Sequence, residues 1–288
     1  VFVGAAGIAV RSIAPIVHGK AVDPAVVVVD ERGQFAIPVL SGHLGGANDL
    51  AREIAALLGG QAVITTATDV NGVFGVDQWA RRQGLVVCRP EQIVDVSSAL
   101  LEGKQISVWS RWPIEGAMPL GMVWGRRESA EVVIDWSCPG VDERRCEKFP
   151  CGGPLWLCPR TLRLGIGCKR GTTATDIQAL AERLTAQEGV PLQAVEAVCS
   201  IDLKREEPGL LAFCRDIGRP LTIYTAWELS QVPGNFSVSS FVQSVTGVDN
   251  VCERAALAAG GRLLRGKITG NGVTAALAGR EPKLDWRT

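Results

Sequence analysis

The sequence has no net charge and no long apolar stretch. Its 30 Lys and Arg residues are balanced by 30 Asp and Glu residues, so it lacks the excess positive charge that binds nucleic acids and anionic membrane surfaces. Its longest apolar runs, such as the one from Ala25 to Val29, are far shorter than the roughly 20 residues of a membrane-spanning helix. These absences predict a protein whose partners include neither nucleic acid nor a membrane.

Cysteine usage and the N-terminal sequence favour the cytoplasm. The nine cysteines are odd in number and spread from Cys88 to Cys252, unlike the disulfide framework of a small secreted protein. The chain also lacks a leader in which basic residues precede an apolar run. We therefore expect free thiols in a reducing compartment. Because the chain begins at Val1, without Met and within a strand-like segment, we also expect an N-terminal truncation.

The sequence contains no recognisable metal or cofactor motif. Cys138, Cys146, Cys151 and Cys158 cluster, but their spacing matches neither a zinc ribbon nor a common iron–sulfur motif. A metal at this cluster is the less favoured alternative to free thiols. Histidine is scarce, since there are only two and both precede residue 44. The C-terminal half therefore cannot form a catalytic cysteine–histidine pair on its own.

Apolar residues, by contrast, are plentiful. They make up 47% of the chain against 21% charged residues, which is ample for folded cores, and 288 residues suit two compact units. Strand and helix signals alternate near both ends. We predict an α/β protein with two α/β domains of mainly parallel sheets, over residues 1–86 and 161–288. A less regular middle region over 87–160 joins them.

The N-terminal domain is predicted to contain a strand–helix–strand unit. Strands are expected over 25–30, 35–40 and 62–66, and a helix over 47–58 lies between the last two. Parallel strands joined by a helix end at one sheet edge, where open α/β sheets bind ligands. The apolar side of this helix carries Leu50, Ile54, Leu57 and Leu58.

The same signals predict the remaining elements. The middle region is expected to contain a helix over 90–101, strands over 105–110 and 132–136, and a connector over 138–159. The C-terminal domain is expected to contain strands over 162–166, 195–201 and 221–224, helices over 175–187, 208–216 and 248–259, and a terminal hairpin of 262–269 with 273–278. The apolar stripe of its first helix is Ile177, Leu180, Ala181 and Leu184.

The most informative segment is the loop Ser41-Gly42-His43-Leu44-Gly45-Gly46-Ala47-Asn48-Asp49, between a predicted strand and a predicted helix. Its glycines let the backbone approach a ligand, and N–H groups at a helix N-terminus attract anions. The pKa of a histidine suits proton transfer near neutral pH, so His43 is a catalytic candidate. A structural histidine or a simple ligand contact is the alternative. The loop matches neither the P-loop nor the dinucleotide-binding motif, which disfavours a nucleotide.

A second polar segment follows the next predicted strand and contains Thr65, Thr66 and Asp69. Sheet topology places Asp69 beside the glycine-rich loop, near His43. The alternative is a turn in which Asp69 only caps the backbone. Arg11 and Lys20 precede the first strong strand, where they bind substrate carboxylates or form a solvated surface.

The C-terminal domain has a comparable loop, from Gly165 to Thr173, at the start of a predicted helix. Its glycines, hydroxyls and two cations suit an anion, although it misses the Rossmann and Walker patterns. Cys168, beside two cations, is a less favoured nucleophile. Asp202 and Lys204 follow the next predicted strand, over 195–201. They either reach the same sheet edge as this loop or belong to an ordinary charged loop. The predicted substrate contacts of this domain are Gly167, Cys168, Arg170, Gly171, Thr172, Asp202 and Lys204.

Motifs along nearly the whole chain resemble one family. In the N-terminal part they are Val3-Gly4-Ala5-Ala6-Gly7-Ile8-Ala9-Val10-Arg11, Asp23-Pro24-Ala25-Val26-Val27-Val28-Val29-Asp30, Ser41-Gly42-His43 and Ile64-Thr65-Thr66-Ala67-Thr68-Asp69. In the C-terminal part they are Leu164-Gly165-Ile166-Gly167-Cys168-Lys169-Arg170-Gly171-Thr172, Ser200-Ile201-Asp202-Leu203-Lys204 and Val251-Cys252-Glu253. In this order they resemble the cobalt-precorrin-5A hydrolase family of oxygen-independent cobalamin biosynthesis. The middle region matches more loosely.

The resemblance implies hydrolysis of the δ-lactone of a cobalt-containing corrinoid, which releases a two-carbon unit as acetaldehyde and gives cobalt-precorrin-5B. The cobalt arrives within the tetrapyrrole substrate, so the chain is expected to hold no cofactor and no metal of its own. Neighbouring pathway methyltransferases are among the partners that we expect. The alternative is a non-enzymatic tetrapyrrole carrier or chaperone of the same pathway. A generic phosphate-ester or nucleotide enzyme comes third.

The residues suit such a substrate, because a flat macrocycle with carboxylate arms needs anion-binding loops along an apolar cleft. We predict that His43, assisted by Asp69, activates water to attack the lactone carbonyl, and that N–H groups near Gly45 and Gly46 stabilise the oxyanion. The predicted substrate contacts in the N-terminal domain are Arg11, Lys20, Ser41, Gly42, Gly45, Gly46, Asn48, Thr65 and Thr66.

Overall fold

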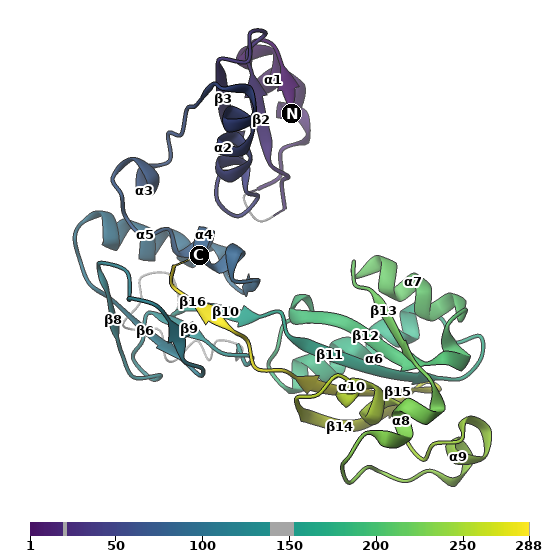
Figure 1. Ribbon diagram of the computed structural model, residues 1–288. Coiled ribbons are helices and arrows are strands. Elements are labelled where there is room, and N and C mark those ends of the chain that lie inside the picture. Colours follow the sequence, from purple (N-terminus) through teal and green to yellow (C-terminus); the bar gives the residue numbers. More distant parts are fainter. Residues whose placement is uncertain (20–21, 139–152, 288) are drawn as a thin grey trace. The chain divides into compact units, whose positions relative to one another are not determined.

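The structure is a computed structural model that describes residues 1–19, 22–138 and 153–287. The chain forms two compact units (Figure 1). Unit 1 holds Val1–Ile134, strand β10 (Leu155–Pro159) up to Leu157, and the segment from Leu284 onward. Unit 2 holds Cys158–Lys283 and the short segment that begins at Asp135. The chain therefore enters unit 2 at Asp135, is back in unit 1 at Leu155, enters unit 2 again at Cys158 and returns to unit 1 at Leu284.

The N-terminal part of unit 1 is a four-stranded sheet. Its strands, in spatial order, are β1 (Phe2–Val3), β2 (Val26–Val29), β3 (Phe35–Leu40) and β4 (Gln61–Ala62). β2 and β3 are antiparallel, β3 and β4 are parallel, and helix α2 (Ala47–Leu58) connects the parallel pair. The predicted strand–helix–strand unit is confirmed, although β4 is shorter than expected. Helix α1 (Ala6–Ile13) and a 3-10 turn (Ala14–Ile16), which were not predicted, follow β1.

Helix α2 packs on this sheet through small side chains. Its buried face is formed by Ala47, Ala51 and Ala55, whereas Leu57 and Leu58 are 85% and 55% exposed. The predicted apolar stripe, which included both leucines, was therefore wrong at this end. Alanines spaced by four residues follow one face of a helix, and their small size lets the helix backbone approach the sheet closely.

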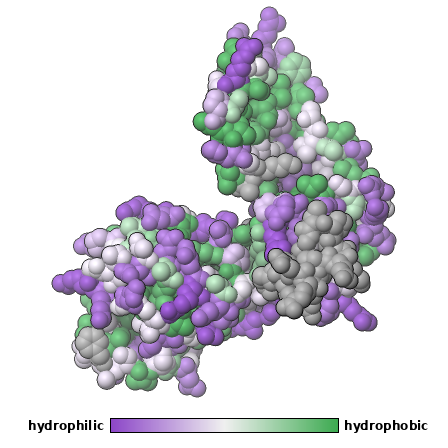
Figure 2. Space-filling view, turned by 180° about the vertical axis from the view of Figure 1, so that it is seen from behind, coloured by the Kyte–Doolittle hydropathy of each residue, from purple (hydrophilic) through white to green (hydrophobic). Residues whose placement is uncertain are grey.

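The N-terminal residues of unit 1 form the lobe at the top of Figure 2, and many apolar side chains are exposed on its surface. Val3, Ile8, Val10 and Ile16 are all at least 49% exposed, and Ala9 is the buried residue of α1. Helix α1 therefore contributes little to the core.

A second sheet of unit 1 has five strands. In spatial order they are β5 (Leu85–Val87), β10, β9 (Val132–Ile134), β6 (Ile106–Ser110) and β8 (Met122–Trp124). The pairs β10–β9, β9–β6 and β6–β8 are parallel. Its helices are α3 (Ala67–Val70), α4 (Val76–Arg82) and α5 (Ile93–Leu101), the last preceded by a 3-10 turn (Pro90–Gln92).

The middle region is thus more regular than the sequence suggested. The connector predicted over 138–159 was wrong at its end, because every residue of β10 is buried. Cys146 and Cys151 of the predicted cysteine cluster lie outside the described residues. The Sγ of Cys158 is buried within β10, where it contacts the Trp136 carbonyl oxygen at 3.1 Å.

A two-stranded sheet joins the C-terminal segment to unit 1. Strand β16 (Leu284–Asp285) pairs in parallel with β7 (Ile114–Glu115). Trp286 stacks on Trp79 of α4 with ring centroids 4.5 Å apart, and Trp79 Nε1 donates a hydrogen bond to the Asp285 carbonyl oxygen at 2.8 Å. These contacts complete unit 1.

Unit 2 is built on a five-stranded sheet. In spatial order its strands are β13 (Leu221–Tyr224), β12 (Val195–Ile201), β11 (Leu162–Cys168), β15 (Val273–Gly279) and β14 (Arg262–Gly270). The first three are parallel, and the hairpin of β14 and β15 adds antiparallel pairs. The helices are α6 (Ala174–Gln187), α7 (Pro208–Asp216), α8 (Ala226–Gln231), α9 (Ser240–Thr246) and α10 (Cys252–Leu257), with 3-10 turns at Leu192–Ala194 and Asp202–Lys204.

Most of unit 2 was predicted correctly. The strands, helices α6 and α7 and the terminal hairpin are confirmed, and the predicted stripe of α6 is buried. Helices α8 and α9 were not predicted, and α10 is shorter than the predicted helix. Among the described residues, no helix combines the length and apolar character needed to cross a membrane.

Helix α10 lies directly against β11 at Gly165. A Cβ atom at this position would lie only 1.8 Å from the Cys252 carbonyl oxygen of α10, so the approach requires glycine. Leu164, Ile166 and Ala255 around this contact are fully buried. The contact therefore lies in the core of unit 2.

Candidate functional site

The loop between β3 and α2 has a defined shape that presents His43. Ser41 adopts a left-handed conformation with φ of 55°, and its hydroxyl donates a hydrogen bond to the Asp23 carbonyl oxygen at 2.8 Å. A Cβ atom at Gly45 would lie 2.3 Å from the Ser41 Cβ. Gly46, with φ of 82°, is the N-cap of α2. Ser41, Gly45 and Gly46 therefore set the geometry of the loop.

His43 lies between two carboxylates. Its Nε2 is 2.8 Å from Oδ2 of Asp69 in α3, and its Nδ1 is 3.0 Å from Oδ1 of Asp77 in α4. The three side chains are largely buried, with exposed fractions of 11%, 13% and 10%. Because ionised carboxylates only accept hydrogen bonds, both ring nitrogens must donate. The arrangement therefore favours the doubly protonated imidazolium.

The electrostatics agree with this protonation state. Burial lowers the pKa of His43, but hydrogen bonds and negative charges from Asp77 and Asp69 outweigh burial and raise the pKa above its usual value. Burial raises the pKa of Asp69, but His43 and Arg52 lower it by more than burial raises it. The net pKa is therefore below its usual value, and Asp69 stays ionised. His43 is thus equipped to donate a proton. Activation of water, as predicted from the sequence, would require a ring nitrogen free of proton and carboxylate.

Asp69 is held in place by two further side chains. Arg52 Nη2 donates to Asp69 Oδ1 at 2.5 Å, and Asn48 Nδ2 donates to Asp69 Oδ2 at 3.0 Å and to Thr66 Oγ1 at 2.8 Å. Asn48 is only 1% exposed. A buried amide that links α2 to the segment before α3 orients Asp69 toward the imidazole of His43.

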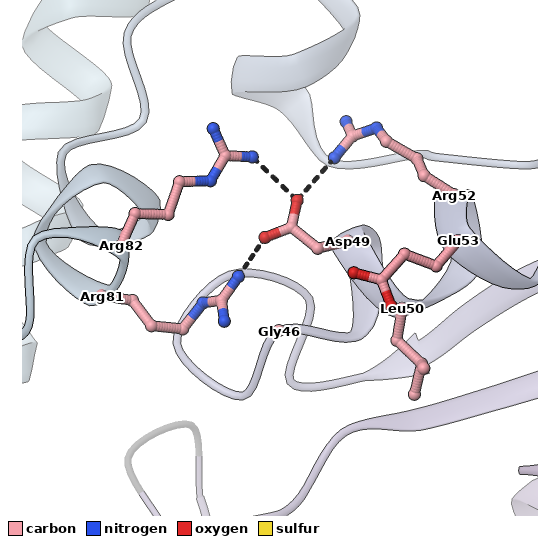
Figure 3. A pocket seen from close by; sticks show the side chains of 7 residues that line it. All are labelled: Gly46, Asp49, Leu50, Arg52, Glu53, Arg81 and Arg82. Atoms are coloured by element: carbon pink, nitrogen blue, oxygen red, sulfur yellow. Dashed lines mark hydrogen bonds and ion pairs between the residues drawn. The ribbon is translucent and has the colours of Figure 1, made fainter. Parts of the chain in front are cut away.

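A second ion-pair network fixes α4 to α2 (Figure 3). Asp49 of α2 accepts a hydrogen bond from Arg82 Nη2 at 2.8 Å and from Arg52 Nη1 at 3.2 Å, and it also contacts Arg81. Burial raises the pKa of Asp49, but the three guanidinium groups, Arg82 first, lower it overall. These residues line a cavity of about 530 Å³. Since α4 also carries Asp77, the network keeps that carboxylate next to the His43 loop.

In unit 2, an internal carboxylate fills the loop after β11. The Gly171 N–H donates to Glu207 Oε1 at 2.7 Å, and Lys204 Nζ lies 2.8 Å from Glu207 Oε2. The Thr172 hydroxyl donates to the Lys169 carbonyl oxygen at 2.8 Å. The anion-binding groups predicted for this loop are therefore partly used within the protein.

A larger cavity, of about 800 Å³, opens in unit 2 at the carboxyl ends of β11 and β12. Its lining includes Gly167, Cys168, Arg170 and Lys204, all of which were predicted as substrate contacts. Burial raises the pKa of the Cys168 thiol by more than Lys204 lowers it. Cys168 thus lines the cavity, and its raised pKa does not favour the thiolate that a nucleophile needs.

Comparisons with known proteins identify the family. Residues 1–69 match the family model described as "Cobalamin synthesis G N-terminal", and residues 162–278 match "Cobalamin synthesis G C-terminus". The chain is 36% identical over 262 residues to the cobalt-precorrin-5A hydrolase of Priestia megaterium, a match that covers 87% of this chain and 70% of that protein. The chain belongs to the cobalt-precorrin-5A hydrolase family. It is also 37% identical over 290 residues to the Salmonella typhimurium protein of the same name, covering 96% and 80%.

In this member of the cobalt-precorrin-5A hydrolase family, the predicted residues gather in two places. The N-terminal family model contains both His43 and Asp69, which form one hydrogen-bonded group with Asn48 and Thr66. The second group lines the cavity of unit 2. The resemblance predicted from the sequence motifs is therefore confirmed, while the catalytic and binding roles of these residues stay predictions.

Other predicted residues lie elsewhere or serve the local backbone. Arg11 is exposed on α1 and forms no ion pair within the described residues. Thr65 is exposed, and Lys20 lies outside the described residues. Asp202 Oδ1 accepts a hydrogen bond from the Leu203 N–H at 2.8 Å. The Gly46 N–H, predicted as an oxyanion donor, donates a hydrogen bond to the His43 carbonyl oxygen at 3.0 Å.

Sequence reasoning missed Asp77, Arg81 and Arg82 in this family member. They lie in α4, a helix that was not predicted. The sequence carries one signal for Asp77, which is a carboxylate placed between the apolar residues Val76 and Trp79. Both of these neighbours are buried. A carboxylate at a buried helix position needs a partner.

The Lys204–Glu207 pair provides a first testable prediction. Burial raises the pKa of Glu207, but Lys204 and the Gly171 N–H lower it overall. Its ionised form therefore stabilises the fold above the pKa of an unfolded carboxyl group, and this stability is lost as pH falls through the lower folded value. Glu207→Gln should lower the free energy of unfolding by about 2 kcal/mol at neutral pH, measured by urea denaturation. Glu206→Gln, at an exposed neighbour, is the control. Equal stability of both variants would contradict the prediction.

Proposed function

We propose that this chain hydrolyses the δ-lactone of cobalt-precorrin-5A and releases its two-carbon unit as acetaldehyde, giving cobalt-precorrin-5B. The observation that carries the proposal is the His43 ring held between the carboxylates of Asp69 and Asp77. It occurs in a chain that is 37% identical, over 96% of its length, to a protein named cobalt-precorrin-5A hydrolase. A positioned acid whose pKa lies above that of a free histidine suits protonation of the oxygen that departs from the lactone carbonyl.

The proposed reaction breaks two bonds. Water adds to the lactone carbonyl carbon and the acyl–oxygen bond breaks, which leaves a carboxylic acid and an alkoxide. His43 donates its proton to the alkoxide, and solvent takes the proton lost by water and that of the new carboxylic acid. Neutral His43 then takes back the alcohol proton as the carbon–carbon bond to the macrocycle breaks. The electron pair of the broken carbon–carbon bond stays on the conjugated macrocycle, and acetaldehyde leaves.

This sequence uses His43 first as an acid and then as a base. Both ring nitrogens are bonded to carboxylates in the structure, so the substrate oxygen must displace one of the two carboxylates. The other carboxylate keeps the ring oriented and stabilises its charge. The cobalt enters as part of the substrate in this proposal. The cytoplasmic location and the methyltransferase partners stay predictions from the sequence.

An anaerobic assay tests the proposal directly. The purified chain is incubated with the cobalt lactone, and volatile aldehyde is trapped while the corrinoid product is separated. We expect one acetaldehyde for each lactone consumed. A chain that binds the lactone but releases no acetaldehyde would instead be the carrier or chaperone that is the alternative function.

The pH dependence of this assay is the second prediction. Because the pKa of His43 is raised, the acid form persists to higher pH than in a free histidine, and the rate should fall as pH rises through that pKa. Asp77→Asn removes one negative charge, so it should lower this pKa and move the alkaline fall to lower pH. Asp216→Asn, at an exposed end of α7, should leave the profile unchanged. An identical profile in the Asp77 variant would exclude His43 as the titrating acid.

A further inference from the structure

The cavity of unit 2 is lined by both apolar and cationic side chains. The apolar ones include Ile201 at the end of β12, Leu203 after it, and Val242 and Val245 of α9. Leu203 and Val245 are 62% and 61% exposed. Large aliphatic side chains that remain this exposed around a cavity of about 800 Å³ suit a ligand with a broad apolar surface.

The cationic side chains of the lining come from three segments. Lys169 and Arg170 follow β11, Lys204 follows β12, and Lys267 lies in β14. Lys204 is paired with Glu207. Within the described ranges 1–19, 22–138 and 153–287, the other three side chains have no carboxylate within ion-pair distance.

The carboxylates of this cavity are already occupied. Glu207 binds Lys204 and the Gly171 N–H, and Asp249 forms an ion pair with Arg254 at 2.7 Å. Neither carboxylate forms an ion pair with Arg170 or Lys267, although the charge of Arg170 contributes to lowering the pKa of Glu207. The four cations of the lining outnumber its two carboxylates, and exposed apolar side chains line the same cavity.

Resting on the proposed function, we propose that this cavity is a recognition site, separate from His43, for the carboxylate arms and one apolar edge of the tetrapyrrole substrate. Arg170 and Lys267 bind carboxylates, and Leu203 with the α9 valines contacts the macrocycle. Arg170 suits a carboxylate because its planar fork donates two parallel hydrogen bonds. Lys204 forms an ion pair with Glu207, so its role is to order the loop after β12 and not to bind the substrate.

Binding can be measured without turnover by using uroporphyrin, a stable flat tetrapyrrole with carboxylate arms around its rim, as the probe. The full chain is titrated at low ionic strength and uroporphyrin fluorescence is followed. The double variant Arg170→Ala/Lys267→Ala should weaken binding by at least about tenfold, because each charge-assisted hydrogen bond is worth a factor of that order. Leu203→Asp should weaken it comparably. Added salt should weaken wild-type binding.

Matched controls separate this site from other surfaces. Arg215→Ala/Lys283→Ala removes two exposed cations that do not line the cavity, and Leu120→Asp alters a leucine of unit 1 that is 97% exposed. His43→Ala tests the other site. All three should bind uroporphyrin like the wild type. Citrate, which has carboxylates but no apolar body, should compete only weakly.

Two outcomes would overturn the inference: the cavity variants bind uroporphyrin as the wild type does, or His43→Ala weakens binding as strongly as they do. The acetaldehyde assay on the same preparations keeps this separate from the proposed function. A chain that releases acetaldehyde but fails the binding test overturns only the recognition site. A chain that binds uroporphyrin through Arg170 and Lys267 but releases no acetaldehyde overturns only the hydrolase activity.

Discussion

The variant His43→Ala is expected to release acetaldehyde about 10²- to 10⁴-fold more slowly than the wild type, which is the usual contribution of a positioned acid–base group. Loss of the imidazolium removes the proton donor for the departing oxygen and leaves Asp69 and Asp77 facing each other without a cation between them. Rates under single-turnover conditions measure the chemical step. Substrate affinity should change little, since the proposed carboxylate contacts lie in unit 2.

The chain supplies its own control for this experiment. His18 is the only other histidine and is exposed, so His18→Ala should retain the wild-type rate. Asp69→Asn should also slow the reaction strongly, because it removes a carboxylate that contacts His43 Nε2. Turnover near the wild-type rate in both His43→Ala and Asp69→Asn would refute the acid–base role.

Gly165→Ala is expected to destabilise unit 2 by about 3 kcal/mol or more, at the upper end of what overpacking costs in protein cores. The added methyl group would overlap the Cys252 carbonyl oxygen at 1.8 Å, and backbone atoms lie on both sides of this contact. A side-chain rotation cannot relieve the overlap, so α10 must move off β11. Urea denaturation combined with hydrogen exchange of β11 amides measures the effect.

Gly270→Ala is the matched control in the same sheet. A Cβ atom there would first meet Leu180 Cδ1 at 3.3 Å and then the Arg183 side chain, and both can shift. We expect a change of less than about 1 kcal/mol at such a site. Equal effects of the two substitutions would show that the β11–α10 contact yields more easily than its geometry suggests.

The elements that could be predicted from sequence are those whose local pattern and tertiary burial agree. The apolar stripe of α6, with Ile177, Leu180 and Leu184, follows helical periodicity, and all three side chains are buried in the core. Helix α2 shows the opposite case, because its leucines gave the stronger apolar signal although its alanines face the sheet. Hydrophobicity alone ranks Leu57 above Ala51, whereas the close approach of backbone to backbone reverses that order.

The candidate site divides in the same way. Proximity of His43 and Asp69 could be expected, because both follow strands that end at one sheet edge. Asp77 could not, since it reaches His43 only through the tertiary placement of α4. The filled loop after β11 was also beyond sequence reasoning. Glu207 lies 36 residues from Gly171, and no local pattern shows that it binds there in place of an external anion.

The return of the chain to unit 1 has a consequence for its biosynthesis. Strand β16 and Trp286 complete a sheet and an aromatic stack with β7 and Trp79, yet the ribosome makes them only after all of Cys158–Lys283. During synthesis, domains fold in order as they emerge. The nascent N-terminal unit therefore emerges with β7 lacking its partner strand and Trp79 lacking the ring that stacks on it, so unit 1 can be completed only after unit 2 has been synthesised.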